Sequence, residues 1–291
     1  MKSRLSVRRL RSDRSWVNQL FSIAVVVLLT GCAGPPSPVE SLPEGWGQFD
    51  LSVDGRRRTY ASYTPTDGDP RGLMVVLHGS GQSVGHMIGA VEAESVADER
   101  GVVVVVPAGT NGGWNDEDPP DGDQPDDVAF IDALVMDVTT AHPSIPPDHV
   151  FAHGFSNGGG LATRLACESR YIRGVGVVGN YYVPIGDECL RPVGHPVPGW
   201  FGAGGDDEVV PVEAVRERIP DYAVDLTECP TTGRLQPVAS GDVPSGDVCM
   251  QMTDCAHVRL CEYRDRGHEV LPGSVLAAWS FLSESVQGLA N

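Results

Sequence analysis

Two short stretches of the sequence match the pattern Gly-x-Ser-x-Gly, which often surrounds a nucleophilic serine. One is GFSNG at 154–158, centred on Ser156, and the other is GQSVG at 81–85, centred on Ser83. The chain contains 35 glycines, so either match can arise without a catalytic role. The residues around each copy must therefore decide which serine, if either, is a nucleophile.

The copy at 154–158 has the surroundings that a nucleophile requires. An apolar run, HVFAH at 149–153, leads directly into Gly154, and a helix-compatible run, GGLATRLACES, follows the serine. A strand that turns sharply into a helix places the serine at the helix N-terminus, where amide groups favour developing negative charge. We therefore interpret Ser156 as the nucleophile.

The copy at 81–85 is better explained as a partner of that site. Its strand, LMVVL at 73–77, ends before the match, and the sequence HGSG at 78–81 intervenes. Such a turn after an early strand is typical of a segment that supplies one backbone N–H group of an oxyanion hole. We expect the N–H groups of Ser80 and Asn157 to form that hole.

Serine is a weak nucleophile without a base, so this interpretation requires a histidine and an acid further along the chain. His268 lies in the Gly-flanked stretch RGHEVLPG, after the apolar run HVRLC. Asp207 lies in the stretch GGDDEVVP, after the run GWFGA, and its neighbour Asp206 is an alternative acid. The chain order serine, acid, histidine predicts a triad of Ser156, Asp207 and His268.

Alternating apolar runs and helical spacings predict the elements that position these residues. The expected strands are 73–77, 102–106, 149–153, 175–178, 199–203 and 257–261. Their continuous apolar character is typical of a mostly parallel sheet with helices on both faces. Helices are expected at 128–138, capped by Asp126 or Asp127, and at about 274–286. No repeat or change of composition divides 47–291, so we expect a single α/β domain there.

The first 31 residues have the composition of an export signal. Basic residues precede an apolar core at 20–29, which is too short to span a membrane. The core ends in LTGC, which resembles a bacterial lipobox, so we expect a lipid on Cys32. An ordinary secretory signal and an uncleaved anchor are the alternatives. Residues 32–46, rich in Pro, Gly and Ser, are expected to be a flexible tether.

The location follows from this signal and from the charge. We expect an exported protein of the cell envelope, on the periplasmic or cell-surface side, with the lipid as its membrane contact; otherwise it is secreted. The formal net charge is −18, and residues 1–31 carry six basic residues and one acidic residue, so the remainder carries −23. Such a body is repelled by nucleic acid and by anionic head groups, and no nucleic-acid partner is expected.

An even set of six cysteines besides Cys32 predicts disulfide bonds in an exported protein. They are Cys167, Cys189, Cys229, Cys249, Cys255 and Cys261. They contain no Cys-x-x-Cys pair and His257 is isolated, which argues against a metal site. The segment 225–249 otherwise looks loop-like, and we expect disulfides to staple it, with Cys229–Cys255 and Cys167–Cys189 as preferred pairs. The acidic stretch at 115–127 does not match an EF-hand loop, so no metal is expected there.

An ordered set of motifs resembles the secreted esterases that include polyhydroxybutyrate depolymerases, feruloyl esterases and related acetylxylan esterases. The motifs are VVLHGSGQS (75–83), VVVVVPAGTNGGWND (102–116), DDVAFIDALVMDV (126–138), VFAHGFSNGGGLATRLAC (150–167), GGDDEVVP (204–211) and RGHEVLPG (266–273). The similarity spans about residues 72–285. It implies an α/β-hydrolase fold and ester hydrolysis through an acyl-enzyme, with no cofactor.

The same resemblance implies roles for individual positions. They are nucleophile for Ser156, base for His268, acid for Asp207, and oxyanion donors for Ser80 and Asn157. The acid is placed by the family's Asp-x-Val-Val-Pro, which aligns with DEVVP here.

The sequence also departs from the family at two points. An aromatic residue that is common near the site is replaced by Leu271, and the turn GGDD keeps Asp206 as a second candidate acid. Trp114 either contacts the substrate or anchors its loop on the core. The expected substrates are feruloyl, acetyl or soluble hydroxyalkanoate esters. A non-catalytic ligand-binding lipoprotein, a serine peptidase and a thioesterase are the alternative functions.

Overall fold

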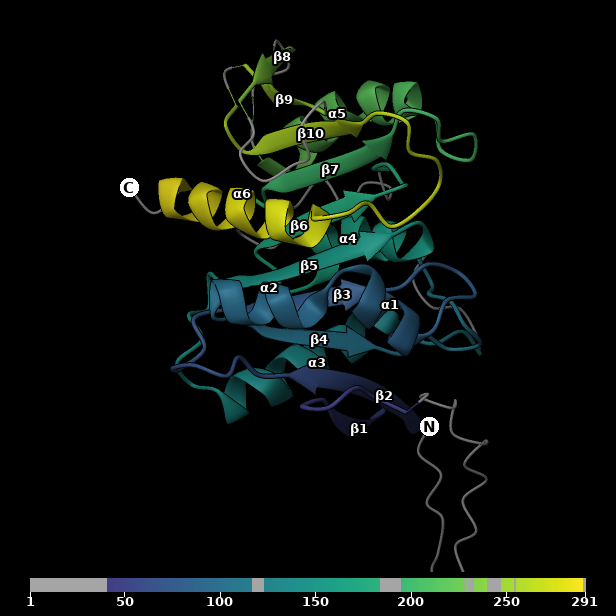
Figure 1. The fold of residues 1–291 in the computed structure, drawn as a ribbon, viewed down its shortest axis with the longest axis vertical. Helices are drawn as coiled ribbons and strands as arrows, with labels where there is room; N and C mark the ends of the chain where they lie inside the picture. The colour runs from purple at the N-terminus through teal and green to yellow at the C-terminus, as the bar shows by residue number, and fades with distance from the viewer. Residues whose placement is uncertain are drawn as a thin grey trace, which may run out of the picture. The chain divides into compact units, whose positions relative to one another are not determined.

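Ten strands form one mixed β-sheet in the part of the chain that the computed structural model describes (Figure 1). That part comprises residues 41–116, 123–183, 195–227, 229, 233–239, 247–253 and 255–289. The strands are β1 (Gly47–Val53), β2 (Arg56–Tyr63), β3 (Leu73–Leu77), β4 (Val103–Pro107), β5 (Val150–Phe155), β6 (Gly174–Val178), β7 (Gly199–Gly204), β8 (Leu235–Val238), β9 (Val248–Met252) and β10 (Val258–Tyr263). Their order across the sheet is β1-β2-β4-β3-β5-β6-β7-β10-β9-β8.

The six central strands run parallel, so their carboxyl ends meet at one edge of the sheet. β4, β3, β5, β6, β7 and β10 pair in parallel, whereas β1 and β2 on one side and β9 and β8 on the other pair antiparallel. Central strands such as LMVVL and VVVVP are buried along their whole length and require cover on both faces. In Figure 1 the carboxyl ends of these strands lie on the right.

Six helices within the described ranges supply that cover, three on each face (Figure 1). They are α1 (Val84–Ala90), α2 (Ala93–Arg100), α3 (Asp127–Ala141), α4 (Asn157–Glu168), α5 (Val212–Thr227) and α6 (Ser274–Leu289). On one face, α3, α4 and α5 bury side chains such as Leu134, Leu161 and Val215. On the other, α1, α2 and α6 bury side chains that include Met87 and Trp279.

The predicted architecture is confirmed, with small shifts at the ends of elements. All six predicted strands are present, and the last predicted helix is α6. The helix expected at 128–138 is α3, and the side chain of Asp126 caps it by accepting a hydrogen bond from the N–H of Ala129 at 2.9 Å. The chain therefore has the mostly parallel, helix-covered sheet of an α/β-hydrolase fold.

The hairpin of β1 and β2 was not predicted, because its strands are polar. β2 begins with the run Arg56-Arg57-Arg58, and β1 is largely exposed. The turn between them is Asp54-Gly55, in which both residues have positive φ, 50° and 74°. An Asp-Gly pair with this geometry is a strong local signal for a two-residue hairpin turn, and it identifies the hairpin despite the polar strands.

The expectation that 225–249 is loop-like is wrong at both ends. Helix α5 continues through Thr227, and β8 occupies Leu235–Val238. β8 and β9 end the sheet on this side, where strands stay partly exposed and carry polar residues. Their weak apolar pattern hid them from sequence inspection.

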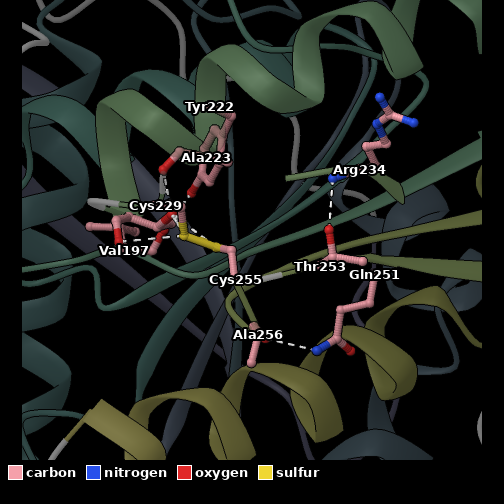
Figure 2. Close-up of a disulfide and its surroundings, with 10 residues drawn as sticks. Val197, Tyr222, Ala223, Cys229, Arg234, Gln251, Thr253, Cys255 and Ala256 are labelled. Atoms are coloured by element: carbon pink, nitrogen blue, oxygen red, sulfur yellow. Dashed lines mark hydrogen bonds between the residues drawn. A yellow bond between two sulfur atoms is a disulfide. The ribbon is translucent and has the colours of Figure 1, made fainter. Parts of the chain in front are cut away.

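Two disulfide bonds join described cysteines in this part of the sheet. The predicted pair Cys229–Cys255 is confirmed and links the end of α5 to the turn before β10 (Figure 2). A second bond, Cys249–Cys261, joins directly opposite positions of β9 and β10. Cys167 is also disulfide-bonded, whereas its predicted partner, Cys189, lies outside the described residues.

Candidate active site

Ser156 lies on a sharp turn between β5 and α4. Its backbone has φ 53° and ψ −122°, a strained combination for a residue with a side chain. Two glycines permit the turn. A Cβ atom on Gly154 would lie 2.0 Å from the carbonyl oxygen of Gly158, and one on Gly158 would lie 2.5 Å from the carbonyl oxygen of Leu77. The Gly-x-Ser-x-Gly pattern thus builds the strand-turn-helix geometry that exposes a nucleophilic serine.

The structure brings Ser156, His268 and Asp207 together from three loops at the carboxyl edge of the sheet. His268 Nε2 lies 3.0 Å from Ser156 Oγ, and His268 Nδ1 lies 2.8 Å from Asp207 Oδ2. Asp207 follows β7 and His268 follows β10, which are neighbouring parallel strands. When the carboxylate accepts from Nδ1–H, Nε2 is left to accept the serine proton.

Of the two candidate acids, Asp207 contacts the histidine. Asp207 is buried, and its Oδ1 atom accepts hydrogen bonds from two backbone N–H groups at 2.9 and 2.8 Å. Asp206 is exposed, and its N–H donates to the carbonyl oxygen of Arg266. The backbone bonds fix the Asp207 carboxylate in the orientation that reaches His268.

Two further residues, which the sequence analysis did not single out, pack against the imidazole ring of His268. The ring of Phe155 lies 5.0 Å from that of His268, measured between centroids. Gly179 has φ +59°, and a Cβ atom there would lie 3.1 Å from His268 Cε1. Leu271, which stands where the family commonly has an aromatic residue, is buried in the same core cluster as residues of α6.

The segment HGSG at 78–81 turns beside the elbow and is fixed by buried His78. His78 Nε2 accepts a hydrogen bond from the N–H of Gly109 at 3.0 Å, so Nδ1 carries the hydrogen and donates to the carbonyl oxygen of Gly79 at 2.9 Å. Burial lowers the pKa of His78, which favours the neutral ring, and the two hydrogen bonds select the tautomer. The turn is therefore pinned to the loop after β4.

The two predicted oxyanion donors lie at this junction. Ser80 belongs to the HGSG turn, and Asn157 is the first residue of α4. Neither backbone N–H has a hydrogen-bond acceptor among the described residues, so both are available to a ligand. The N–H of the next residue, Gly81, donates to the carbonyl oxygen of Gly112 at 2.7 Å and holds the turn in place.

Ser83, the serine of the second Gly-x-Ser-x-Gly match, has a structural place. It is the N-cap of α1, and its Oγ atom accepts a hydrogen bond from the N–H of His86 at 3.1 Å. Serine is a preferred residue at that position because it satisfies an N–H group that the helix leaves unpaired.

Trp114 anchors the loop after β4 onto the elbow. Its ring is buried, and Nε1 donates to the carbonyl oxygen of His78 at 2.8 Å. The side chain of Asn157 holds its main chain: Oδ1 accepts from the N–H of Trp114 at 2.7 Å, and Nδ2 donates to its carbonyl oxygen at 3.0 Å. Both the indole ring and the main chain of Trp114 are therefore fixed by hydrogen bonds, as expected of a residue that anchors its loop.

The next residue, Asn115, is held by two buried charges. Its N–H donates to Asp127 Oδ2 at 2.7 Å, while Asp127 Oδ1 pairs with Arg58 at 2.6 Å. Arg164 donates to the carbonyl oxygen of Asn115 at 3.0 Å. Asp127 was considered as a helix cap, but its carboxylate instead ties β2 and α3 to this loop.

A cavity of about 510 Å³ opens beside the oxyanion donors. Its lining includes Ser80, Asn157, Thr110, Asn111, Asp116 and Gln124. One wall is thus the loop fixed by Trp114 and Asn115, and another part of the lining is Asn157, the residue after Ser156.

Several predicted features lie outside this site. The expected signal at 1–31 and the lipid attachment point Cys32 fall outside the described residues. Trp46, at the end of the expected tether, is buried, and its Nε1 atom donates to Glu94 at 2.6 Å. Over the described ranges, no helix has the length and apolar character needed to cross a membrane. Nor do three His, Cys, Asp or Glu side chains gather there to hold a metal ion.

Comparison with known proteins relates the chain to esterases, although no family model matches it. A putative esterase, NocK, from Nocardia uniformis subsp. tsuyamanensis is 30% identical over 67% of this chain and 65% of its own length. Feruloyl esterase C from Emericella nidulans is 29% identical over 86% of this chain and 89% of its own length. The solved structure of an acetyl xylan esterase from Aspergillus awamori superposes with a TM-score of 0.59 at 12% identity, over 81% of this chain and 99% of the other.

The chain therefore has an α/β-hydrolase fold, in which a serine, a histidine and an aspartate lie within hydrogen-bond distance of one another. The comparisons confirm the resemblance to esterases that the motifs indicated. Its relatives carry names of feruloyl and other esterases at 26–32% identity.

Proposed function

We propose that the protein is an exported, lipid-anchored serine esterase that hydrolyses carboxylic esters through an acyl-enzyme. The observation that carries this proposal is the hydrogen-bonded series from Ser156 Oγ through His268 to buried Asp207. The backbone N–H groups of Ser80 and Asn157, which have no acceptor among the described residues, support it as candidate oxyanion donors.

The first half of the reaction forms the acyl-enzyme. His268 Nε2 takes the hydroxyl proton of Ser156 as Oγ attacks the ester carbonyl carbon, and the N–H groups of Ser80 and Asn157 stabilise the oxygen that becomes negative. Asp207 orients the imidazole and stabilises its cationic form. The intermediate then collapses: His268 gives the proton to the alcohol oxygen as the carbon–oxygen bond breaks, and the alcohol leaves.

The second half releases the acid. His268 removes a proton from water as the water oxygen attacks the acyl carbon, and the same two N–H groups stabilise the second tetrahedral intermediate. Collapse of that intermediate breaks the bond to Ser156 Oγ, which recovers its proton from His268. The cycle uses protein groups and water alone.

Lipid attachment is supported by the sequence LTGC that ends at Cys32, and export by the composition of the first 31 residues and by the disulfide bonds. Cys229–Cys255 and Cys249–Cys261 are bonds that persist in an oxidising compartment. Lipid attachment at Cys32 is tested by growing cells with a labelled fatty acid. We expect label on the wild-type protein and none on the Cys32→Ser variant, and equal labelling of both would contradict the proposal.

The substrate class is drawn from the relatives. The names feruloyl esterase and acetyl xylan esterase describe esters of feruloyl and acetyl groups, and we propose that this chain acts on such esters or on soluble hydroxyalkanoate oligomers.

The mechanism is tested by treating the detergent-solubilised full-length protein with a fluorophosphonate probe and locating the added mass by peptide mass spectrometry. We expect the mass on Ser156 and none on the Ser156→Ala variant. A folded, disulfide-intact sample that takes up no probe would contradict the proposal and favour a non-catalytic ligand-binding protein. Cleavage of a peptide amide in place of an aryl ester would indicate a peptidase.

A further inference from the structure

The segment at the end of β6, Val178-Gly179-Asn180, contacts both Ser156 and His268. The N–H of Ser156 donates to the carbonyl oxygen of Val178 at 2.8 Å. Asn180 Nδ2 donates to the carbonyl oxygen of Ser156, also at 2.8 Å. Between them, Gly179 lies so close to the imidazole that a Cβ atom there would be 3.1 Å from His268 Cε1. One segment of three residues therefore holds both backbone polar atoms of the proposed nucleophile and touches the proposed base.

The side chain amide of Asn180 is held in one orientation. Its Oδ1 atom accepts a hydrogen bond from the N–H of Tyr181 at 2.7 Å, and Nδ2 is the atom that faces Ser156. In an amide the oxygen accepts and the nitrogen donates, so both ends have the partner that they require. Asn180 is half-buried, and its Cβ atom lies 3.1 Å from the place that a Cβ atom would take on Gly159, in the first turn of α4. The amide is thus packed against α4 and directed at the Ser156 carbonyl.

The carbonyl oxygen of Ser156 accepts two hydrogen bonds. The N–H of Gly160 donates to it at 3.0 Å, at the beginning of α4, and Asn180 Nδ2 is the second donor. A carbonyl oxygen has two lone pairs, so both bonds can form. Because the donors belong to different parts of the fold, α4 and the end of β6, the carbonyl cannot turn without losing one of them.

The same peptide unit carries one of the proposed oxyanion donors. The carbonyl of Ser156 and the N–H of Asn157 belong to one peptide bond, which is trans. A peptide unit is planar, and in the trans form its C=O and N–H groups point in opposite directions. The hydrogen bond from Asn180 therefore restrains the direction of the Asn157 N–H. It also polarises the amide, which makes that N–H a stronger donor.

We infer that Asn180 is a positioning residue of the oxyanion hole, acting through the peptide unit between Ser156 and Asn157. The inference rests on the proposed function, in which the Asn157 N–H stabilises the oxyanion. Without the Asn180 amide, that N–H is less firmly directed and a weaker donor. The charged transition state then loses stabilisation, whereas binding of the uncharged ester changes little.

The test compares 4-nitrophenyl acetate with its thiono analogue, in which sulfur replaces the carbonyl oxygen. Both esters require attack by Ser156 and proton removal by His268. Sulfur is larger than oxygen and a weak hydrogen-bond acceptor, so donors placed for an oxyanion stabilise it poorly. With the full-length protein in excess over the ester, release of 4-nitrophenol gives the acylation rate constant for each ester, even where turnover is slow.

Two substitutions of Asn180 remove the donor in different ways. Asn180→Ala deletes the amide, and the backbone there lies outside the positive-φ region, so alanine suits it. We expect acylation by the oxygen ester to slow about tenfold and acylation by the thiono ester to change by less than about twofold. Asn180→Asp keeps the size of the side chain and an acceptor for the Tyr181 N–H, but places a second acceptor against the Ser156 carbonyl. It should slow the oxygen ester at least as much.

Gln48→Ala is the control. It also removes a side chain amide, from an exposed position of β1 at the end of the sheet. Both acylation rate constants should stay at the wild-type value. Circular dichroism and the Tm of each variant report whether it is folded, and the isosteric Asn180→Asp decides the test if Asn180→Ala is not.

The outcomes distinguish this inference from the proposed function. A smaller ratio of oxygen-ester to thiono-ester rate in the Asn180 variants supports the inference. Equal losses with both esters would place the effect of Asn180 on the nucleophile, the base or the fold, and unchanged rates would mean that its amide positions nothing; either result overturns the inference and leaves the esterase proposal intact. Absence of 4-nitrophenol release by the wild type, together with no fluorophosphonate labelling, would instead contradict the proposed function.

Discussion

The side chain of Asn157 makes two hydrogen bonds with the backbone of Trp114: Oδ1 accepts from its N–H at 2.7 Å, and Nδ2 donates to its carbonyl oxygen at 3.0 Å. Asn157 also supplies one of the two proposed oxyanion N–H groups from its own backbone. One residue therefore couples the start of α4 to the loop that walls the cavity.

Removal of that side chain is expected to lower turnover although the backbone donor remains. In Asn157→Ala, the Trp114 backbone loses both partners, and a small displacement of the oxyanion donors is costly because the reaction depends on their position. We expect kcat to fall about tenfold or more while KM changes little. Gln236→Ala, an amide truncation on exposed edge strand β8, is the control and should keep wild-type kcat. A wild-type kcat in Asn157→Ala would show that the two hydrogen bonds to Trp114 do not position the proposed oxyanion donors.

The two serines of the Gly-x-Ser-x-Gly matches should behave differently. Ser156→Ala removes the proposed nucleophile, and we expect essentially no hydrolysis of 4-nitrophenyl acetate. Ser83→Ala removes the cap of α1, so it should lower the free energy of unfolding by about 1 kcal/mol and leave most of the activity. Loss of activity in Ser83→Ala with retention in Ser156→Ala would reverse the assignment.

Substitutions of the neighbouring acids Asp206 and Asp207 should have very different effects on kcat. In Asp207→Asn, the amide no longer stabilises the cationic imidazole, and we expect kcat to fall by about three to four orders of magnitude. Asp206→Asn makes the same chemical change one residue earlier, on an exposed side chain, and most activity should remain. Steady-state kinetics with an aryl ester measures both, and a larger loss in Asp206→Asn would contradict the geometry.

His153 should make the fold sensitive to acid. It is fully buried in β5, neither ring nitrogen has a hydrogen-bond partner among the described residues, and burial lowers its pKa to about 3. The unfolded chain has a histidine pKa of about 6.5, so below that pH the unfolded state binds a proton that the folded state does not. Stability is therefore full above the unfolded pKa and decreases as the pH falls toward 3, by about 2 kcal/mol at pH 5.

Urea unfolding of the wild type and of His153→Leu at pH 7.5 and pH 5 measures this contribution. The loss of stability between the two pH values should be about 2 kcal/mol smaller in the variant, whatever its stability at pH 7.5. Equal losses in the two proteins would mean that His153 is not the group responsible.

The sequence predicts the apolar elements of the fold better than the elements that depend on paired charged residues. The central strands and α3 were predictable because their apolar patterns are strong. The polar β1–β2 hairpin was missed although Asp54-Gly55 signals its turn. The burial of Arg58 has no sequence signal, because it depends on pairing with Asp127, which is far away in the chain. Charged residues in such pairs look exposed in a sequence.

The same limit applies to the site. The order of serine, acid and histidine was readable, and so was the HGSG turn. The choice between Asp206 and Asp207 required the three-dimensional arrangement, because both follow the same strand and one residue of difference decides which carboxylate faces His268. The hold of Asn157 on Trp114 has no sequence signal, since it joins a side chain to a backbone 43 residues away.

The contact of Gly158 with the carbonyl oxygen of Leu77 has a further meaning. It sets the turn at Ser156 against the end of β3 through main-chain atoms, so a side chain at position 158 would push Ser156 away from the HGSG turn. A substitution of Gly158 is therefore expected to abolish activity although it alters no residue of the proposed triad.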